Sequence, residues 1–149
     1  MEADVRRLSR EYGVADGIRF AGFLNDEAKI REGSTADIFL NTNRIDNTPV
    51  SVIEACALGL PIVATRVGGI SDLLTHNESA LLVPDNDDRA MAEAILQLLR
   101  DPDLAARLSA GGRRIAEQCS WDEITCRWQD LLAEVTETVP GQALGEGVA

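Results

Sequence analysis

The sequence predicts an α/β protein in which helices cover both faces of a parallel sheet and further helices follow. Segments with helical and with strand character alternate along residues 2–84, an order typical of parallel strands joined by crossover helices. Hydrophobic residues make up 45% of the chain but aromatic residues only 4%, which predicts an aliphatic, alanine-rich core. Short, continuous apolar runs indicate strands buried on both faces. These runs are residues 36–42, 60–66 and 79–84.

The first part of the chain predicts a helix, a strand and a second helix. Apolar residues three and four positions apart predict a helix over residues 2–13, which Gly13 ends. Residues 18–23 alternate between apolar and polar character and predict a further strand. With the three apolar runs, the predicted sheet has about four strands. An Asn-Asp pair then suits an N-cap and predicts a short helix over residues 25–34.

The middle of the chain contains the clearest helix signals. Thr48 suits the N-cap, Pro49 the first helical position and Gly59 the stop of a helix over residues 48–59. A glycine turn then leads into a short helix within residues 67–77.

Three helices are predicted after the last strand. The first, residues 87–101, places Met91, Ile95 and the pair Leu98–Leu99 on one apolar face. The second, residues 101–120, should be weakened by its adjacent glycines, Gly111 and Gly112.

Ser120 is the predicted N-cap of the last helix, residues 121–135. The organisation is then one partial domain over residues 1–137 and a tail over 138–149, which we expect to be disordered.

Composition excludes several functions. The net charge of −11 argues against nucleic acid or an anionic membrane as the main partner. Three cysteines without metal-ligand spacing and a single histidine argue against a Cys/His zinc site, and scattered thiols fit a reducing cytosol. No apolar run approaches the roughly 18 residues needed to span a bilayer, and nothing at the N-terminus indicates a signal peptide.

The candidate site lies after the strand at 36–42, because ligands of parallel sheets bind outside the carboxyl ends of the strands. The helix that starts near Pro49 directs its first amides toward this loop, which suits a phosphate, and Arg44 could add positive charge. Glu54 lies one to two turns into the helix, where it could accept hydrogen bonds from a ribose diol. Asp46 could hold another hydroxylated group. This combination describes a nucleotide sugar.

A plainer interpretation stays open on these residues alone. Thr48–Pro49 is then only a capped helix start, Glu54 a solvated helix residue, and Asp46–Asn47 a turn.

Two long segments carry a resemblance to a known family. Residues 46–74, which begin DNTPVSVIEACALG, and residues 80–104 resemble the C-terminal domain of group 1 (family 4) glycosyltransferases of the GT-B fold. The similarity extends over about residues 2–135. It implies a Rossmann-like fold of three layers, with a parallel sheet between two layers of helices, that is truncated at its start.

The resemblance also implies residue roles. The family carries two acids separated by seven residues, here Asp46 and Glu54. The second binds the donor ribose and the first contacts the donor sugar, while backbone amides between them contact the sugar and the distal phosphate. The base lies near a strand end that corresponds to 22–24. The implied donor-binding residues are Gly22, Phe23, Arg44, Asp46, Asn47, Thr48, Val50, Ser51 and Glu54.

The sequence departs from the family pattern at several positions. Asp46 replaces the usual glutamate and is one methylene shorter, so its sugar contacts could differ. Asn47 stands where glycine is common, and Cys56 stands where methionine is common and is predicted to pack in the core. The turn at 68–72 is expected to shape the corner beside the donor. A direct contact with the donor and a plain glycine turn without a role in binding both stay open. His76 is predicted to be a surface residue.

The family's catalytic residues belong to an N-terminal acceptor domain, and an Arg and a Lys that neutralise the donor diphosphate belong to the start of the C-terminal domain. We expect both parts to be missing here, so the isolated chain should be inactive. The strand at 36–42 would then have a bare hydrophobic edge. We expect a homodimer across this edge, a rearrangement of 18–23 against it, or a partner chain that supplies the missing domain.

The implied function is transfer of a hexosyl group from a UDP-, GDP- or ADP-sugar to a hydroxyl acceptor, with retention of configuration. The implied enzyme needs no metal or cofactor and is cytoplasmic, a location that allows peripheral attachment to a membrane. A non-catalytic interaction or nucleotide-sugar-binding module derived from this fold is the alternative. A sugar-nucleotide epimerase is a third, less favoured alternative. The donor and the acceptor are not specified.

Overall fold

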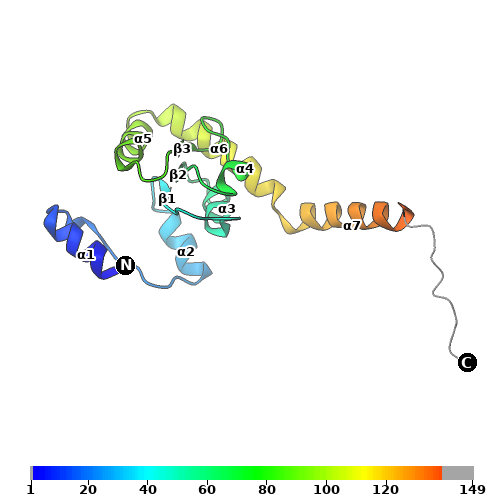
Figure 1. Cartoon of the computed structure of the whole chain (residues 1–149), viewed down its shortest axis with the longest axis horizontal. Coiled ribbons are helices and arrows are strands. Elements are labelled where there is room, and N and C mark those ends of the chain that lie inside the picture. Colours follow the sequence, from blue (N-terminus) through cyan, green and yellow to red (C-terminus); the bar gives the residue numbers. More distant parts are fainter. Residues whose placement is uncertain (1, 139–149) are drawn as a thin grey trace, which may run out of the picture. The chain divides into compact units, whose positions relative to one another are not determined.

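The computed structural model describes residues 2–138, which divide into two compact units, one ending at Glu32 and the other beginning at Gly33 (Figure 1). The first unit contains α1 (Glu2–Glu11), the short 3₁₀ helix η1 (Ala15–Gly17) and most of α2 (Asp26–Gly33). The second unit contains all three strands and the remaining helices.

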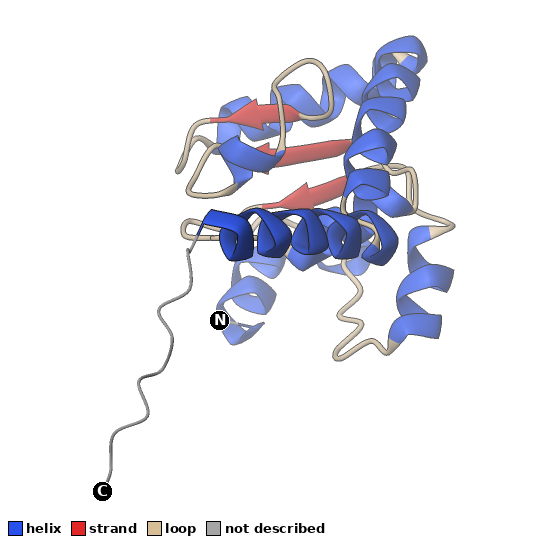
Figure 2. Ribbon diagram, turned by 90° about the vertical axis from the view of Figure 1, so that its right-hand side faces the viewer, coloured by secondary structure: helices blue, strands red, loops and turns tan. Residues whose placement is uncertain are grey.

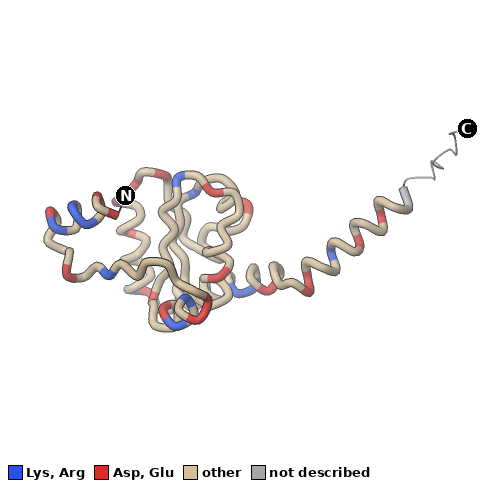
Figure 3. The backbone as a smooth tube through the Cα atoms, turned by 90° about the horizontal axis from the view of Figure 1, so that it is seen from below, with Lys and Arg blue, Asp and Glu red and all other residues tan. Residues whose placement is uncertain are grey.

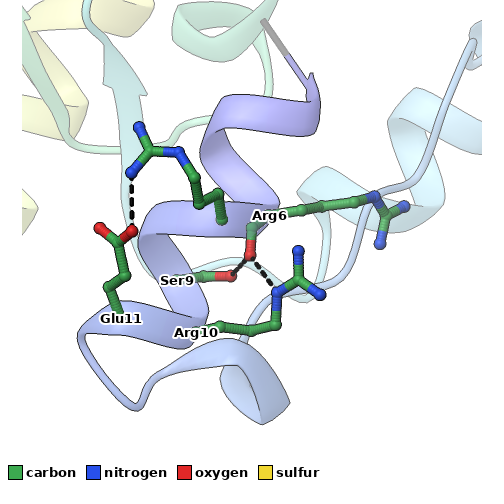
Figure 4. A network of polar contacts seen from close by, with 5 residues as sticks. Arg6, Ser9, Arg10 and Glu11 are labelled. Atoms are coloured by element: carbon green, nitrogen blue, oxygen red, sulfur yellow. Dashed lines mark hydrogen bonds and ion pairs between the residues drawn. The ribbon is translucent and has the colours of Figure 1, made fainter.

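Helix α1 confirms the first predicted helix. Gly13 follows it with a φ of 68°, in the left-handed region that favours glycine at a helix end. Polar contacts along one side of the helix support it (Figure 4). The Ser9 hydroxyl and the Arg10 Nε both donate to the Arg6 carbonyl at 3.0 Å. These contacts are local to the helix, so we assign them a structural role.

The predicted strand at residues 18–23 is wrong, because this segment forms no strand pairing. Its alternating pattern is real, but residues 18–23 form no ladder hydrogen bonds with any described strand. The expected rearrangement of 18–23 against the strand predicted at 36–42 is therefore wrong as well. Side-chain contacts hold the segment instead. The Arg6 guanidinium lies 4.0 Å from the centre of the Phe20 ring, and Arg19 forms an ion pair with Glu32. The following helix α2 is capped as predicted, with the Ala28 amide donating to Asn25 Oδ1 at 3.0 Å.

The other three predicted strands form one parallel sheet (Figure 2). They are β1 (Phe39–Asn41), β2 (Ile62–Thr65) and β3 (Leu81–Val83), in the order β1-β2-β3. Each is shorter than its apolar run, and β1 is an outer strand of this sheet. The α/β fold class with a parallel sheet is therefore confirmed, with three strands in the described residues.

Alternate strand residues face two separate cores, which defines three layers. Ile62 and Ala64 pack with α3 (Val50–Ala57) and α4 (Ile70–Leu73) on one face of the sheet. Val63 packs on the other face. That face is covered by α5 (Asp88–Arg100) and α6 (Pro102–Gln118).

Helix α3 begins one residue later than predicted. Pro49, with an extended ψ of 98°, occupies the N-cap, and Thr48 lies before it, so the prediction of Thr48 as N-cap is wrong. The Pro49 carbonyl accepts from the Val52 amide at 2.9 Å. No side-chain cap bond forms, because proline offers no acceptor at this position. Gly59, with a φ of 75°, ends the helix as predicted.

Helix α5 shows one error in the predicted core. Leu98 is 3% exposed, but Leu99 is 56% exposed and does not belong to the apolar face. Adjacent residues of a helix point about 100° apart, so only one of the pair can face the sheet squarely.

A single residue joins α5 to α6. The Asp101 amide donates to the Gln97 carbonyl at 3.0 Å and closes α5, and Asp101 Oδ1 accepts from the Leu104 amide at 2.9 Å and caps α6. Asp101 is therefore both the last cap of one helix and the first cap of the next.

The two glycines in α6 do not interrupt it. The helix runs from Pro102 to Gln118, and both glycines are buried. A Cβ on Gly111 would lie 2.9 Å from the Glu78 carbonyl carbon and closer still to its oxygen. A Cβ on Gly112 would lie 3.2 Å from the Sγ atom of Cys56. These glycines allow α6 to approach the backbone of the loop after α4.

Helix α7 (Trp121–Thr138) follows, and the predicted Ser120 cap is confirmed by a bond of 3.4 Å from the Glu123 amide. Acidic residues outnumber basic ones along it (Figure 3). The predicted disordered tail begins within this helix, at Thr138, and its remaining residues lie outside those described. None of the helices in the described range has the length and apolarity required to cross a membrane.

Cys56 is fully buried between α3 and α6, which confirms it as a core residue. Burial, with a smaller contribution from Cys119 nearby, raises the pKa of the Cys56 thiol to about 11. The thiol therefore stays protonated and unreactive at neutral pH. Since an unfolded chain would ionise it near pH 9, its contribution to stability is lost as the pH rises from about 9 to about 11.

Candidate functional site

The loop between β1 and α3, residues 42–49, lies at the carboxyl end of the sheet, where the sequence predicts the site. Asn41 and Thr65 end β1 and β2 and are only 4% and 5% exposed. Asn41 Oδ1 accepts from the Asn43 amide at 2.9 Å, and the Thr65 hydroxyl donates to the Asn43 carbonyl. Two buried polar side chains therefore fix the start of the loop.

Asp46 is held from two sides. The Asn43 side-chain amide donates to Asp46 Oδ2 at 2.7 Å, and the Gly69 backbone amide donates to the Asp46 carbonyl at 2.9 Å. Asp46 Oδ2 is thus occupied, while Oδ1 makes no hydrogen bond to any described residue.

The turn formed by Gly68 and Gly69 lies directly against this loop. Gly68 has a φ of 47°, and a Cβ on it would lie 3.2 Å from the Asp46 carbonyl carbon. A Cβ on Gly69 would lie 2.7 Å from the Asn47 carbonyl carbon. These contacts show that the turn shapes the corner beside the loop at 42–49, and its position beside a donor stays a prediction. A direct ligand contact stays a prediction.

The amino end of α3 presents unused amides. Thr48, Val50 and Ser51 donate their backbone N–H groups to no other group of the described residues. Pro49 has no amide and is buried. The amides are therefore available to an anion, and the helix dipole favours negative charge here.

Glu54 lies one turn into α3 and is partly buried. Val50 and Ser51 lie four and three residues earlier, so the Glu54 side chain lies on the same side of the helix as their side chains. An anion at the helix end would have a carboxylate beside it on α3 and another in the loop. This arrangement matches the chemistry of a diphosphate flanked by two hydroxylated groups.

Arg44 is directed elsewhere. Its Nε atom lies 3.4 Å from Asp85 Oδ2, and both residues of this ion pair line a cavity of about 510 Å³. This cavity is bounded by the ends of β1 and β2, by residues 84–88 and by one side of α5. The guanidinium already has a carboxylate partner, so its role toward an anion stays a prediction.

The other residues singled out in the sequence lie in the loop at 42–49, in the first unit and before β3. Asn47 is exposed in the loop. Gly22 and Phe23 belong to the first unit, where Gly22 has a φ of 69° and Phe23 is 98% exposed. Their predicted contact with the base stays a prediction. His76 is exposed as predicted, and its Nδ1 atom accepts from the Leu82 amide of β3 at 3.0 Å, a structural role.

The sequence analysis missed Asn41, Asn43 and Thr65. A signal was present, because Asn41 and Thr65 are polar residues near the ends of otherwise apolar runs. Buried polar side chains require hydrogen-bond partners, and here the partner is the loop of the site. No group of three or more His, Cys, Asp or Glu side chains within residues 2–138 could hold a metal ion.

Residues 1–115 match the sequence profile of the family described as glycosyl transferases group 1. Among curated relatives, a GDP-mannose-dependent α-(1-6)-phosphatidylinositol monomannoside mannosyltransferase of Mycobacterium tuberculosis is 29% identical, over 86% of this chain and 35% of the relative. A D-inositol 3-phosphate glycosyltransferase of Jonesia denitrificans is 32% identical, over 97% of this chain and 33% of the relative. The chain therefore spans about a third of the length of these relatives.

Solved structures agree with these matches. A sucrose-phosphate synthase from Thermosynechococcus elongatus superimposes with a TM-score of 0.80 and 29% identity, over 91% of this chain and 34% of that one. HepE from Anabaena, solved in complex with UDP-glucose, superimposes with a TM-score of 0.77 over 92% of this chain and 36% of that one. At 21% identity, this second likeness concerns the fold alone.

Proposed function

The chain belongs to the group 1 glycosyltransferases, and we propose that it carries the donor-binding part of an enzyme that transfers a hexosyl group from a nucleotide-diphosphate sugar to a hydroxyl acceptor. The observation that carries the proposal is the end of α3, where the unpaired amides of Thr48, Val50 and Ser51 stand between Asp46 and Glu54 along the chain. The name of the mycobacterial relative specifies a GDP-mannose donor for that protein. For this chain the nucleotide and the sugar are left open among UDP-, GDP- and ADP-sugars.

Each group has a proposed role. Glu54 accepts hydrogen bonds from the ribose hydroxyls, and Asp46 accepts them from the donor sugar. The amides of Thr48, Val50 and Ser51 bind the distal phosphate and the sugar. The complete enzyme retains the anomeric configuration, as the family resemblance implies.

The isolated chain is proposed to bind donor weakly and to be inactive. It spans about a third of its relatives' length, so most of the surroundings of a complete active site come from other residues. Positioning of the second substrate can supply roughly 7–11 kcal/mol of barrier lowering, which this chain alone does not provide. A transfer assay with the chain alone tests this proposal, and measurable turnover would contradict it.

Replacing Glu54 by glutamine should weaken binding of every nucleotide, with or without its sugar. The ribose would lose hydrogen bonds to a charged acceptor, worth about 1.5–3 kcal/mol each, so affinity should fall at least ~10-fold. Calorimetric titration with UDP, GDP, ADP and their sugars measures this. Glu93→Gln on exposed α5 is the matched control, because it removes the same charge away from the site.

Two results would be decisive against these assignments. If the unaltered chain binds none of the nucleotides or nucleotide sugars, the donor-site proposal is wrong. If Glu54→Gln binds nucleotides as well as Glu93→Gln does, the ribose role is wrong although the site remains.

A second candidate function is a non-catalytic module that binds nucleotide sugars. The Arg44–Asp85 ion pair favours it, because the nearest predicted cation is already neutralised by a carboxylate. The donor-binding part of an enzyme and the non-catalytic module would both bind a nucleotide sugar and differ only in whether the sugar is transferred. Restoring transfer by adding an acceptor-binding chain would support the enzyme, and donor binding without transfer in any combination would support the module.

The outer edge of β1 is the proposed contact for a partner. Within the described residues β1 pairs only with β2, and Leu40 in its middle is 44% exposed. Such an edge favours pairing with another strand, either of a second copy or of a partner chain. Light scattering should show a dimer of the isolated chain that Leu40→Lys shifts toward monomer. A monomer at all concentrations would contradict the homodimer.

The three cysteines, all free, support the further proposal that the protein resides in a reducing cytosol, which cell fractionation would test.

A further inference from the structure

The position of the Asp46 carboxylate depends on a chain of contacts that begins in the sheet. Asn41 and Thr65, both more than nine-tenths buried, hold the backbone of Asn43 from the ends of two neighbouring strands. The side chain of Asn43 then donates to Asp46 Oδ2 at 2.7 Å. Each step is a hydrogen bond, so the rigid strand ends are connected directly to the carboxylate.

The backbone of the same loop is fixed from the opposite side. The Gly69 amide binds the Asp46 carbonyl, and the glycine turn leaves no room for a side chain beside residues 46 and 47. With its carbonyl and one carboxylate oxygen both held, Asp46 presents Oδ1 as the carboxylate oxygen that makes no hydrogen bond within the described residues. A short side chain held in this way has little freedom to adjust to a displaced substrate.

We propose that Asn43, anchored by Asn41 and Thr65, is a positioning residue that directs Asp46 Oδ1 at the donor sugar. The network makes the site selective for the sugar-bearing nucleotide over the bare nucleotide. The inference rests on the proposed function, because it needs a donor at the end of α3. Asn43 is neutral, so its hydrogen bond orients the carboxylate without cancelling the negative charge that a sugar hydroxyl would meet.

The reason for such a network is the reach of aspartate. Aspartate is one methylene shorter than glutamate, so the location of its carboxylate follows closely from its backbone. Groups that act on a substrate must be held to within about 0.5 Å, which requires supporting contacts behind them. The anchoring residues supply these contacts from strand ends, which are more rigid than loops.

Thr65→Val and Asn43→Ala test the inference. Valine keeps the shape of threonine but loses the hydroxyl, and alanine at exposed Asn43 removes only the amide clamp. The probes are UDP with UDP-glucose, GDP with GDP-mannose, and ADP with ADP-glucose, titrated into the full chain. Thr65→Val, which removes a neutral hydrogen bond, should bind the sugar nucleotide about fivefold more weakly. Asn43→Ala removes a bond to a carboxylate and should weaken it at least ~10-fold, and the matching nucleotide should bind both variants unchanged.

Thr65→Ser is the conservative control. Serine retains the hydroxyl that binds the Asn43 carbonyl, so the preference for the sugar nucleotide should return. Thermal unfolding of each variant reports any general destabilisation, which would weaken both probes alike. A general structural role cannot produce a loss confined to the sugar-bearing ligand.

The possible outcomes separate this inference from the proposed function. Equal losses for nucleotide and sugar nucleotide, or no loss for either, would overturn the positioning role while leaving the donor site intact. If the unaltered chain binds nucleotide without any preference for the sugar form, Asp46 does not contact the sugar and the inference is again wrong. Absence of binding to all six probes would remove the proposed function and the inference with it.

Discussion

Gly111→Ala is expected to lower the free energy of unfolding by about 3 kcal/mol, at the upper end of the cost of overpacking. In an open helix this substitution would be favourable by roughly 1 kcal/mol, because alanine has the better helix propensity. Here the new Cβ would lie 2.9 Å from the Glu78 carbonyl carbon and closer to its oxygen. These are backbone atoms, so the clash can be relieved only by moving α6 or the loop after α4. Urea unfolding followed by circular dichroism measures the change.

Gly112→Ala is the matched control for that substitution. The same methyl group is added in the same helix, but it meets the Cys56 Sγ atom at 3.2 Å, a side-chain atom that can shift slightly. The gain in helix propensity then offsets much of the strain, and we expect a change within about 1 kcal/mol. Equal stability of the two variants would show that α6 does not approach Glu78 as closely as described.

Leu98→Ala is expected to be the other strongly destabilising change, at about 2–5 kcal/mol. Leu98 is 3% exposed and packs with Val63 and Leu108 beneath the sheet, so alanine would leave a cavity. Leu99→Ala removes the same atoms from the next residue, which is 56% exposed, and should cost less than about 0.5 kcal/mol. Chemical denaturation of both variants provides the comparison.

The Leu98/Leu99 pair also tests the orientation of α5. Both residues were predicted on one apolar face, and the structure separates them. Equal destabilisation of the two variants would show that α5 presents both leucines to the core, which contradicts the burial of Leu98 alone.

The fold was largely predictable because its strong signals are local. The apolar runs became β1, β2 and β3, and Ser120 and Gly59 mark helix ends as their chemistry requires. The prediction of a strand at 18–23 failed for a non-local reason: its pattern is correct, but the segment pairs with no described strand, and no local pattern encodes strand pairing. The prediction of Thr48 as an N-cap failed because Pro49 has an extended backbone and α3 begins one residue later.

The residues of the candidate site were predictable from the sequence, but the long-range contacts that hold its loop in place were not. The spacing of Asp46 and Glu54 and the start of α3 were visible along the chain. The contact of Thr65 with the loop joins residues that are 22 positions apart, and no local pattern encodes it. The Arg44–Asp85 pair joins residues 41 positions apart, which is why the redirection of Arg44 was not foreseen.

The shared cap at Asp101 sets a strict limit on chain length. Because the residue that closes α5 also opens α6, no slack exists between the two helices that cover one face of the sheet. One inserted residue there would turn the following helix by about 100° and carry Leu104 and Leu108 away from the strands. This junction therefore has a fixed length and fixes the orientation of α6 relative to α5. Natural length variation and engineered insertions belong in exposed segments of the chain away from this junction.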